Sequence, residues 1–191
     1  MLIGVDRRPL DKDIPTLQFN HAIVAVKNTF SLFRKSGKVK YIFLDPTQET
    51  CPYGYLPSYN QDKTCMVFFD GGYKFLRTPL LESHRNRETR DMGIVINGDG
   101  SIDVEKKGIA YGEKCMDLRY YFKHSKPTRR KEILEREISN FCPGGKIVDY
   151  SISNLDSSSL PLSITERFHV PEWLRNAGDD RISFRLPTVE R

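Results

Sequence analysis

The chain has 191 residues, of which 38% are hydrophobic and 29% are charged, a composition typical of a globular protein with one medium or two small domains. Its 30 basic and 25 acidic residues give a formal net charge of +5, which bears only on solubility and nonspecific contacts. No run of 18 apolar residues occurs, so we expect no membrane span. Residues 1–8 do not form a signal peptide, because charges follow the short apolar stretch and no small-residue cleavage site appears.

A short strand is predicted at residues 1–5, followed by a β-hairpin made of two apolar segments, 19–26 and 40–47, with a polar loop around 35–38. His21 opens the first hairpin strand and Asp45 closes the second, so antiparallel pairing brings them to one end of the sheet. A carboxylate beside an imidazole fixes its tautomer and stabilises its charged form, as in a nucleophilic triad. The sequence supplies these two members and no third. The alternative is a half-buried hairpin histidine and an aspartate that caps a turn.

The remaining predicted elements are a Pro/Gly-rich loop at 46–64, a hairpin at 65–69 and 73–78, a second hairpin at 92–96 and 101–105, helices at 111–122 and 127–141, and strands at 146–153, 160–170 and 179–186. Helix 127–141 is favoured by Pro127 in its first turn and by apolar residues at helical spacing. Residues 82–90 lack apolar periodicity, which indicates a domain boundary or the start of an edge strand. The sequence therefore predicts an α+β fold whose antiparallel sheet leads into a β-rich domain with two helices.

Four cysteines occur, with no CxxC spacing, so we predict no zinc site, no other metal and no cofactor. Cys51 and Cys65 flank one loop and either form a disulfide in an oxidising compartment or remain thiols. The basic run at residues 123–131 has no interleaved aromatic side chains. We therefore interpret it as the solvent-exposed start of a helix and expect no nucleic-acid partner. Three loop tyrosines, Tyr53, Tyr55 and Tyr59, either contact a peptide or pack against the loop.

Three short motifs carry a family resemblance: Phe-Asn-His-Ala-Ile at 19–23, Tyr-Ile-Phe-Leu-Asp-Pro-Thr at 41–47, and Tyr-Gly-Tyr-Leu-Pro at 53–57. Through them, residues 18–82 resemble the second half of a bacterial transglutaminase-like domain, within the papain-like cysteine superfamily. Residues from about 90 to 191 resemble the C-terminal domain of unknown function in the subfamily with flanking β-rich domains. The resemblance implies two domains, a C-terminal half of a transglutaminase-like core at 1–83 and a β-rich domain with two helices at 90–191.

In that family a cysteine at a helix N-terminus is the nucleophile, and it precedes the histidine in sequence. The resemblance therefore implies that His21 is the general base and Asp45 its orienting partner. No cysteine precedes His21, so the chain looks like the family cut off just after the cysteine-bearing helix. None of the four cysteines is a good substitute, because a reactive thiol needs a helix N-terminus or a cationic neighbour.

Two functions follow as hypotheses. The first is part of a transglutaminase-like cysteine peptidase or acyltransferase that acts on amide bonds of a protein or peptide, inactive alone because its nucleophile is missing. The second is a noncatalytic β-rich binding or interaction module. The missing helix would leave an apolar sheet face exposed, which predicts self-association. Family members with this arrangement are commonly exported, so the resemblance implies the periplasm or cell envelope.

Overall fold

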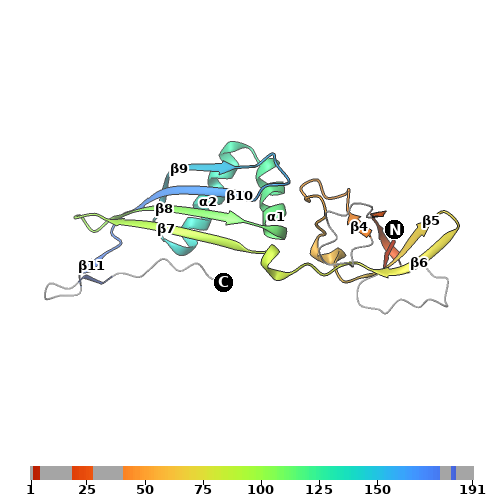
Figure 1. The fold of residues 1–191 in the computed structure, drawn as a ribbon. Helices are drawn as coiled ribbons and strands as arrows, with labels where there is room; N and C mark the ends of the chain where they lie inside the picture. The colour runs from red at the N-terminus through yellow and green to blue at the C-terminus, as the bar shows by residue number, and fades with distance from the viewer. Residues whose placement is uncertain (1, 5–18, 28–40, 177–181, 184–191) are drawn as a thin grey trace. The chain divides into compact units, whose positions relative to one another are not determined.

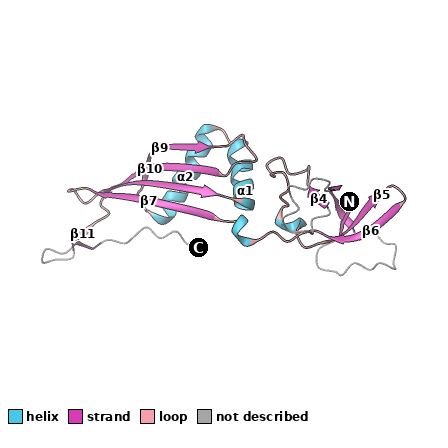
Figure 2. Cartoon of the chain, in the orientation of Figure 1, coloured by secondary structure: helices cyan, strands magenta, loops and turns pink. Residues whose placement is uncertain are grey.

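The computed structural model describes residues 2–4, 19–27, 41–176 and 182–183, and it divides the chain into two units, Met1–Asn86 and Arg87–Arg191 (Figure 1). Every strand pairing in the described residues is antiparallel. Both α-helices belong to the second unit, as Figure 2 shows. The protein is therefore an α+β protein, as the sequence predicts. None of the described helices has the length and apolarity needed to cross a membrane.

The first unit contains a four-stranded sheet and a separate two-stranded one. The larger sheet has the order β2-β1-β5-β6 and is formed by β1 (Leu2–Gly4), β2 (Phe19–Ala22), β5 (Thr64–Phe69) and β6 (Gly72–Arg77). The smaller sheet pairs β3 (Val24–Lys27) with β4 (Tyr41–Leu44). A small apolar core formed by Ile23, Phe43, Leu56, Cys65 and Val67 holds these strands together.

The predicted single strand at 19–26 is two strands in the structure, because Ile23 separates β2 from β3. β2 pairs with β1, and β3 pairs with β4, so the chain changes partner at this residue. Ile23, the residue at which the chain changes sheet, is buried in the core. His21 therefore lies on a different sheet from the strand that leads to Asp45. The predicted loop at 35–38 lies outside the described residues.

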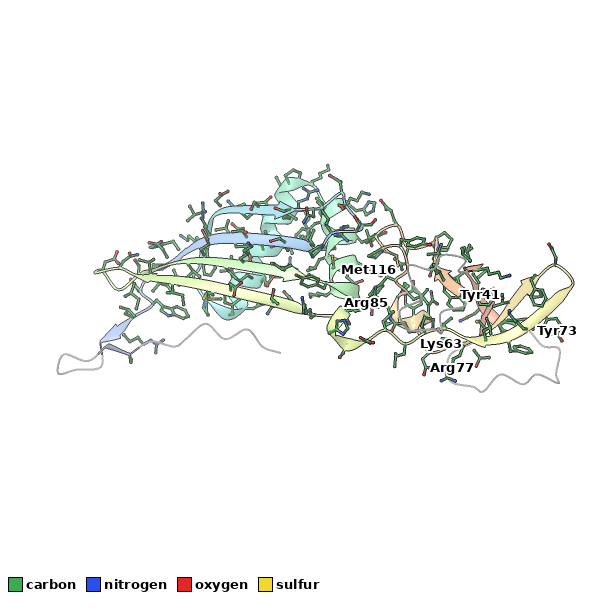
Figure 3. All side chains as sticks on the ribbon, viewed as in Figure 1. Tyr41, Lys63, Tyr73, Arg77, Arg85 and Met116 are labelled. Carbon is green, nitrogen blue, oxygen red and sulfur yellow. The ribbon has the colours of Figure 1, made fainter. Side chains whose placement is uncertain are left out.

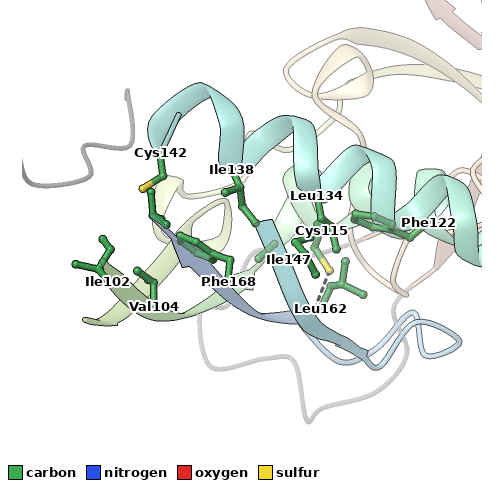
Figure 4. Packing of buried hydrophobic residues seen from close by; sticks show 12 residues of the cluster. Ile102, Val104, Cys115, Phe122, Leu134, Ile138, Cys142, Ile147, Leu162 and Phe168 are labelled. Atoms are coloured by element: carbon green, nitrogen blue, oxygen red, sulfur yellow. Dashed lines mark hydrogen bonds between the residues drawn. The ribbon is translucent and has the colours of Figure 1, made fainter. Parts of the chain in front are cut away.

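The second unit is built on a four-stranded sheet of order β7-β8-β10-β9 (Figure 1). Its strands are β7 (Glu88–Ile96), β8 (Ile102–Ala110), β9 (Lys146–Ser153) and β10 (Leu162–Val170). Strand β8 alternates buried and exposed side chains, with Ile102 and Val104 on the buried face, as expected of a sheet covered on one side. The helices α1 (Gly112–Lys123) and α2 (Pro127–Phe141) pack against that face (Figure 4).

Helix α2 has the predicted bounds, with Pro127 in its first turn and Leu134 and Ile138 buried in the core. A glycine is required just after this helix, because a Cβ atom at Gly145 would lie 2.7 Å from Cγ2 of Ile138 and 3.0 Å from the carbonyl oxygen of Cys142. Helix α1 is linked to the sheet by the backbone amide of Leu162, which donates to Sγ of Cys115 at 3.3 Å (Figure 4). These contacts join both helices to one core.

Several predicted strands differ from the structure in length. The strand predicted at 92–96 already begins at Glu88, so the end of the segment 82–90 belongs to β7. The strand predicted at 101–105 continues to Ala110, because the buried Lys106 forms an ion pair with Glu166 on the neighbouring strand and can stay on the inner face. The tail strand predicted at 179–186 is described only at β12 (Ile182–Ser183), which pairs with β11 (Arg175–Asn176). The rest of that predicted strand lies outside the described residues.

Candidate functional site

The structure places His21 and Asp45 in direct contact, although they come from different sheets. Nε2 of His21 donates a hydrogen bond to Oδ2 of Asp45 at 2.9 Å. His21 lies on β2, and Asp45 directly follows β4, where Pro46 favours an extended backbone. The Asp45 side chain has no exposed surface, whereas 28% of the His21 side chain is exposed. The carboxylate is thus enclosed by protein while the imidazole keeps access to solvent.

The Asp45 carboxylate accepts four hydrogen bonds from the part of the chain that the structure describes. Oδ1 accepts from the backbone amide of Thr47 at 3.0 Å and from its hydroxyl at 2.6 Å. Oδ2 accepts from His21 and also from Nδ2 of Asn60 at 2.6 Å. Burial raises the pKa of Asp45, but the hydrogen bonds from Thr47 and His21 outweigh that effect and hold the pKa below its ordinary value. Asp45 is therefore ionised at neutral pH.

The contact determines which nitrogen of His21 can act as a base. An ionised carboxylate only accepts hydrogen bonds, so Nε2 must carry the proton when the imidazole is neutral. Nδ1 then holds the lone pair that can take a proton from another group. The ring of Tyr59 meets the His21 ring edge-on, with centroids 6.4 Å apart, and its hydroxyl accepts from Nε2 of Gln48 at 2.7 Å. The pair can therefore serve as a general base with a fixed tautomer.

No activated thiol is found among the groups around this pair. All four cysteines are described, and all four are free thiols, so the disulfide between Cys51 and Cys65 is not formed. Burial, together with the charge of Asp45, raises the pKa of Cys51 to about 11. Burial also raises the pKa of Cys65 and of Cys142 to about 11. Cys115 is buried in the other unit. A thiol this weakly acidic is a poor nucleophile at neutral pH.

The sequence interpretation missed two residues that hold Asp45. Thr47 had a usable signal, because a short polar side chain two residues after an aspartate often closes a local turn with it. Asn60 gave none, since it lies in a loop 15 residues further on with no pattern to place it. Of the loop tyrosines, Tyr55 is buried, Tyr53 is exposed and Tyr59 contacts His21, so only Tyr59 borders the site.

The other three histidines have neighbours of their own. His84 contacts Glu82 at 3.1 Å, and His169 contacts Asp103 at 2.9 Å, both at exposed positions. The ring of His124 lies 4.6 Å from that of Tyr120, at an angle of 53°, at the C-terminus of α1. Within the described part of the chain, no group of three or more His, Cys, Asp or Glu side chains is placed to hold a metal ion.

The second unit contains a cavity of about 1050 Å³. Its charged lining residues are the carboxylates Glu88, Glu137, Glu166 and Glu172 and the cations Arg90, Lys106, Lys114 and Arg175. Because the lining has as many negative as positive side chains, its charge favours neither an anionic nor a cationic ligand. Moreover, the innermost of these groups already pair with one another, since Lys106 contacts both Glu137 and Glu166.

Comparison with known proteins finds no match among protein-family models, curated proteins or solved structures. The chemistry of the His21–Asp45 pair is the remaining guide to function.

Proposed function

We propose that His21 and Asp45 are the general base and orienting carboxylate of a thiol-dependent acyl-transfer site acting on amide bonds, as in transglutaminase-like proteins. The single observation that supports this proposal is the 2.9 Å hydrogen bond from Nε2 of His21 to a buried, ionised carboxylate. That bond fixes the tautomer and leaves Nδ1 as the base, which is what a triad requires of its second and third members.

In the proposed reaction, Nδ1 of His21 takes the proton of a cysteine thiol. The thiolate attacks the carbonyl carbon of a protein or peptide amide, the carbon–nitrogen bond breaks, and the leaving amine takes the proton from Nδ1. Water or a second amine then attacks the thioester and releases the cysteine. Asp45 stabilises the imidazolium through Nε2 in each half of the cycle. We propose that neither Cys51 nor Cys65, the thiols of this unit, is the attacking cysteine, because burial raises the pKa of each to about 11, and that the thiol is supplied from outside residues 1–191.

Thiol labelling tests the proposal. The polypeptide is produced with any coding sequence that lies in frame upstream of Met1, and its reaction with iodoacetamide is followed at pH 6 and pH 8. We expect one cysteine outside residues 1–191 to react at pH 6, and His21→Ala to slow that reaction at least about tenfold, because the thiol returns to an ordinary pKa. His84→Ala is the matched control, since that histidine contacts Glu82 and is exposed. Labelling that does not depend on His21 would contradict the proposal.

A second candidate function, a noncatalytic interaction module, is favoured by one surface. The β5–β6 hairpin carries Met66, Phe68, Tyr73 and Phe75 on one face, because Met66 pairs with Phe75 and Phe68 with Tyr73. Phe68 is 58% exposed and Tyr73 is 59% exposed, and the two rings lie 6.4 Å apart. Tyr73 is labelled on this hairpin in Figure 3. Contiguous exposed aromatic residues favour association.

The hairpin surface predicts self-association of the chain. We expect the sedimentation coefficient to rise with protein concentration, and the double variant Phe68→Ser/Tyr73→Ser to remain monomeric over the same range, because it removes the two most exposed rings of the surface. Tyr53→Ser is the control, since Tyr53 is also exposed but belongs to a loop and not to the hairpin. A wild-type chain that sediments as a monomer at every concentration would rule out self-association through this face.

A further inference from the structure

The four donors around Asp45 do not hold it in the same way. Thr47 is only two residues away in sequence and supplies both donors to Oδ1. Among the described residues, Oδ2, the oxygen that binds His21, has one donor besides the imidazole, which is Nδ2 of Asn60 at 2.6 Å. With Oδ1 fixed by Thr47, the carboxylate could still turn about that contact. The position of Oδ2 therefore depends on Asn60.

Asn60 is itself held rigidly. It ends the short 3-10 helix η2 (Ser58–Asn60), its backbone amide donates to the carbonyl of Pro57 at 2.9 Å, and its side chain is buried. The next residue, Gln61, fixes the turn further, because its side-chain amide donates to the carbonyl of Leu56 and accepts from the backbone amide of Leu81. The orientation of the Asn60 amide follows from chemistry, since a carboxylate oxygen can face only its nitrogen.

We propose that Asn60 is a positioning residue that fixes Oδ2 of Asp45 and thereby keeps neutral His21 in the tautomer with the proton on Nε2. The importance of Asn60 for catalysis rests on the proposed function, because a fixed tautomer matters only if Nδ1 of His21 acts as the base. The physical effect does not need the attacking cysteine, however. It can be measured on this chain alone, so its failure is distinguishable from failure of the thiol labelling.

The first test reads the tautomer of His21 by ¹⁵N NMR in alkaline solution, where the ring is neutral. In the wild type we expect the Nε2–H form to exceed the Nδ1–H form by at least about tenfold, as a charge-assisted hydrogen bond implies. In Asn60→Leu, which keeps the branch at Cγ but removes the donor, we expect the ratio to fall below about threefold. Tyr59→Phe is the matched control, because it changes the neighbouring residue and spares Asp45.

A second test needs no change at Asn60 and decides the question if Asn60→Leu does not fold. In an acid titration of the wild type, the side-chain amide signals of Asn60 should move with the same midpoint as the carboxyl carbon of Asp45, below the ordinary value of 3.8. A folded Asn60→Leu variant with the wild-type tautomer ratio would overturn the proposal. Asn60 amide signals that do not respond to the titration of Asp45 would overturn it as well.

Discussion

Replacing Lys106 by methionine should destabilise the Arg87–Arg191 unit by about 3–5 kcal/mol, because it leaves a buried carboxylate without its counter-ion. The Lys106 side chain is 4% exposed, and its Nζ lies 2.6 Å from Oε2 of Glu166 and 2.9 Å from Oε1 of Glu137. Glu137 is partly exposed and can be solvated when the lysine is lost, but Glu166 is buried. Burial already raises the pKa of Glu166, and Lys106 is the group that most opposes that effect.

The double variant Lys106→Met/Glu166→Leu should recover this loss and reach wild-type stability or exceed it by about 1–4 kcal/mol, since replacing both members of a buried ion pair with apolar residues removes the desolvation cost. Unfolding in urea can be followed by fluorescence of Trp173, the single tryptophan of the chain, which packs against the core of this unit. Lys107→Met is the control, because Lys107 is the next residue of β8 and is exposed. Equal losses in Lys106→Met and Lys107→Met would contradict the expectation.

The elements that the sequence predicted well are those whose signals are local. Helix α2 begins at Pro127 and ends before Gly144 and Gly145, and its buried Leu134 and Ile138 follow helical spacing. Strand β8 was predicted too short because Lys106, an inward-facing charge, interrupts the apolar alternation. Its partner Glu166 lies on another strand, and only the paired register shows that the two charges meet inside the fold.

In the candidate site, too, some residues could be predicted from the sequence and others could not. His21 and Asp45 could be paired from the sequence because two apolar segments predicted a hairpin, and the two side chains do meet. The structure differs from the predicted hairpin in one respect: the chain changes strand partner at Ile23, so His21 lies on another sheet. The alternation of apolar residues does not reveal such a change of partner. Asn60 could not be predicted, because its role depends on how an irregular loop folds back onto Asp45.

Shortening Phe168 to alanine should also destabilise the Arg87–Arg191 unit by about 3–5 kcal/mol, the usual cost of removing a buried aromatic ring. Phe168 is fully enclosed on β10, and its ring meets that of Phe141 on α2 edge-on, with centroids 5.8 Å apart at an angle of 80°. Its strand neighbours Val104 and Ile147 are buried with it. The cavity left by the ring would lie between sheet and helix, where neither side can collapse without breaking its own hydrogen bonds.

The measurement for Phe168→Ala is again the urea midpoint from Trp173 fluorescence, with Val148→Ala as the control. Val148 lies on the adjacent strand β9 but is 72% exposed, so we expect a change below about 0.5 kcal/mol. Because small domains are stable by only about 5–15 kcal/mol, the Phe168 variant should be close to unfolding at 37 °C while the Val148 variant behaves as the wild type. A Phe168 variant as stable as the Val148 control would mean that the rings of Phe168 and Phe141 do not hold the helix to the sheet.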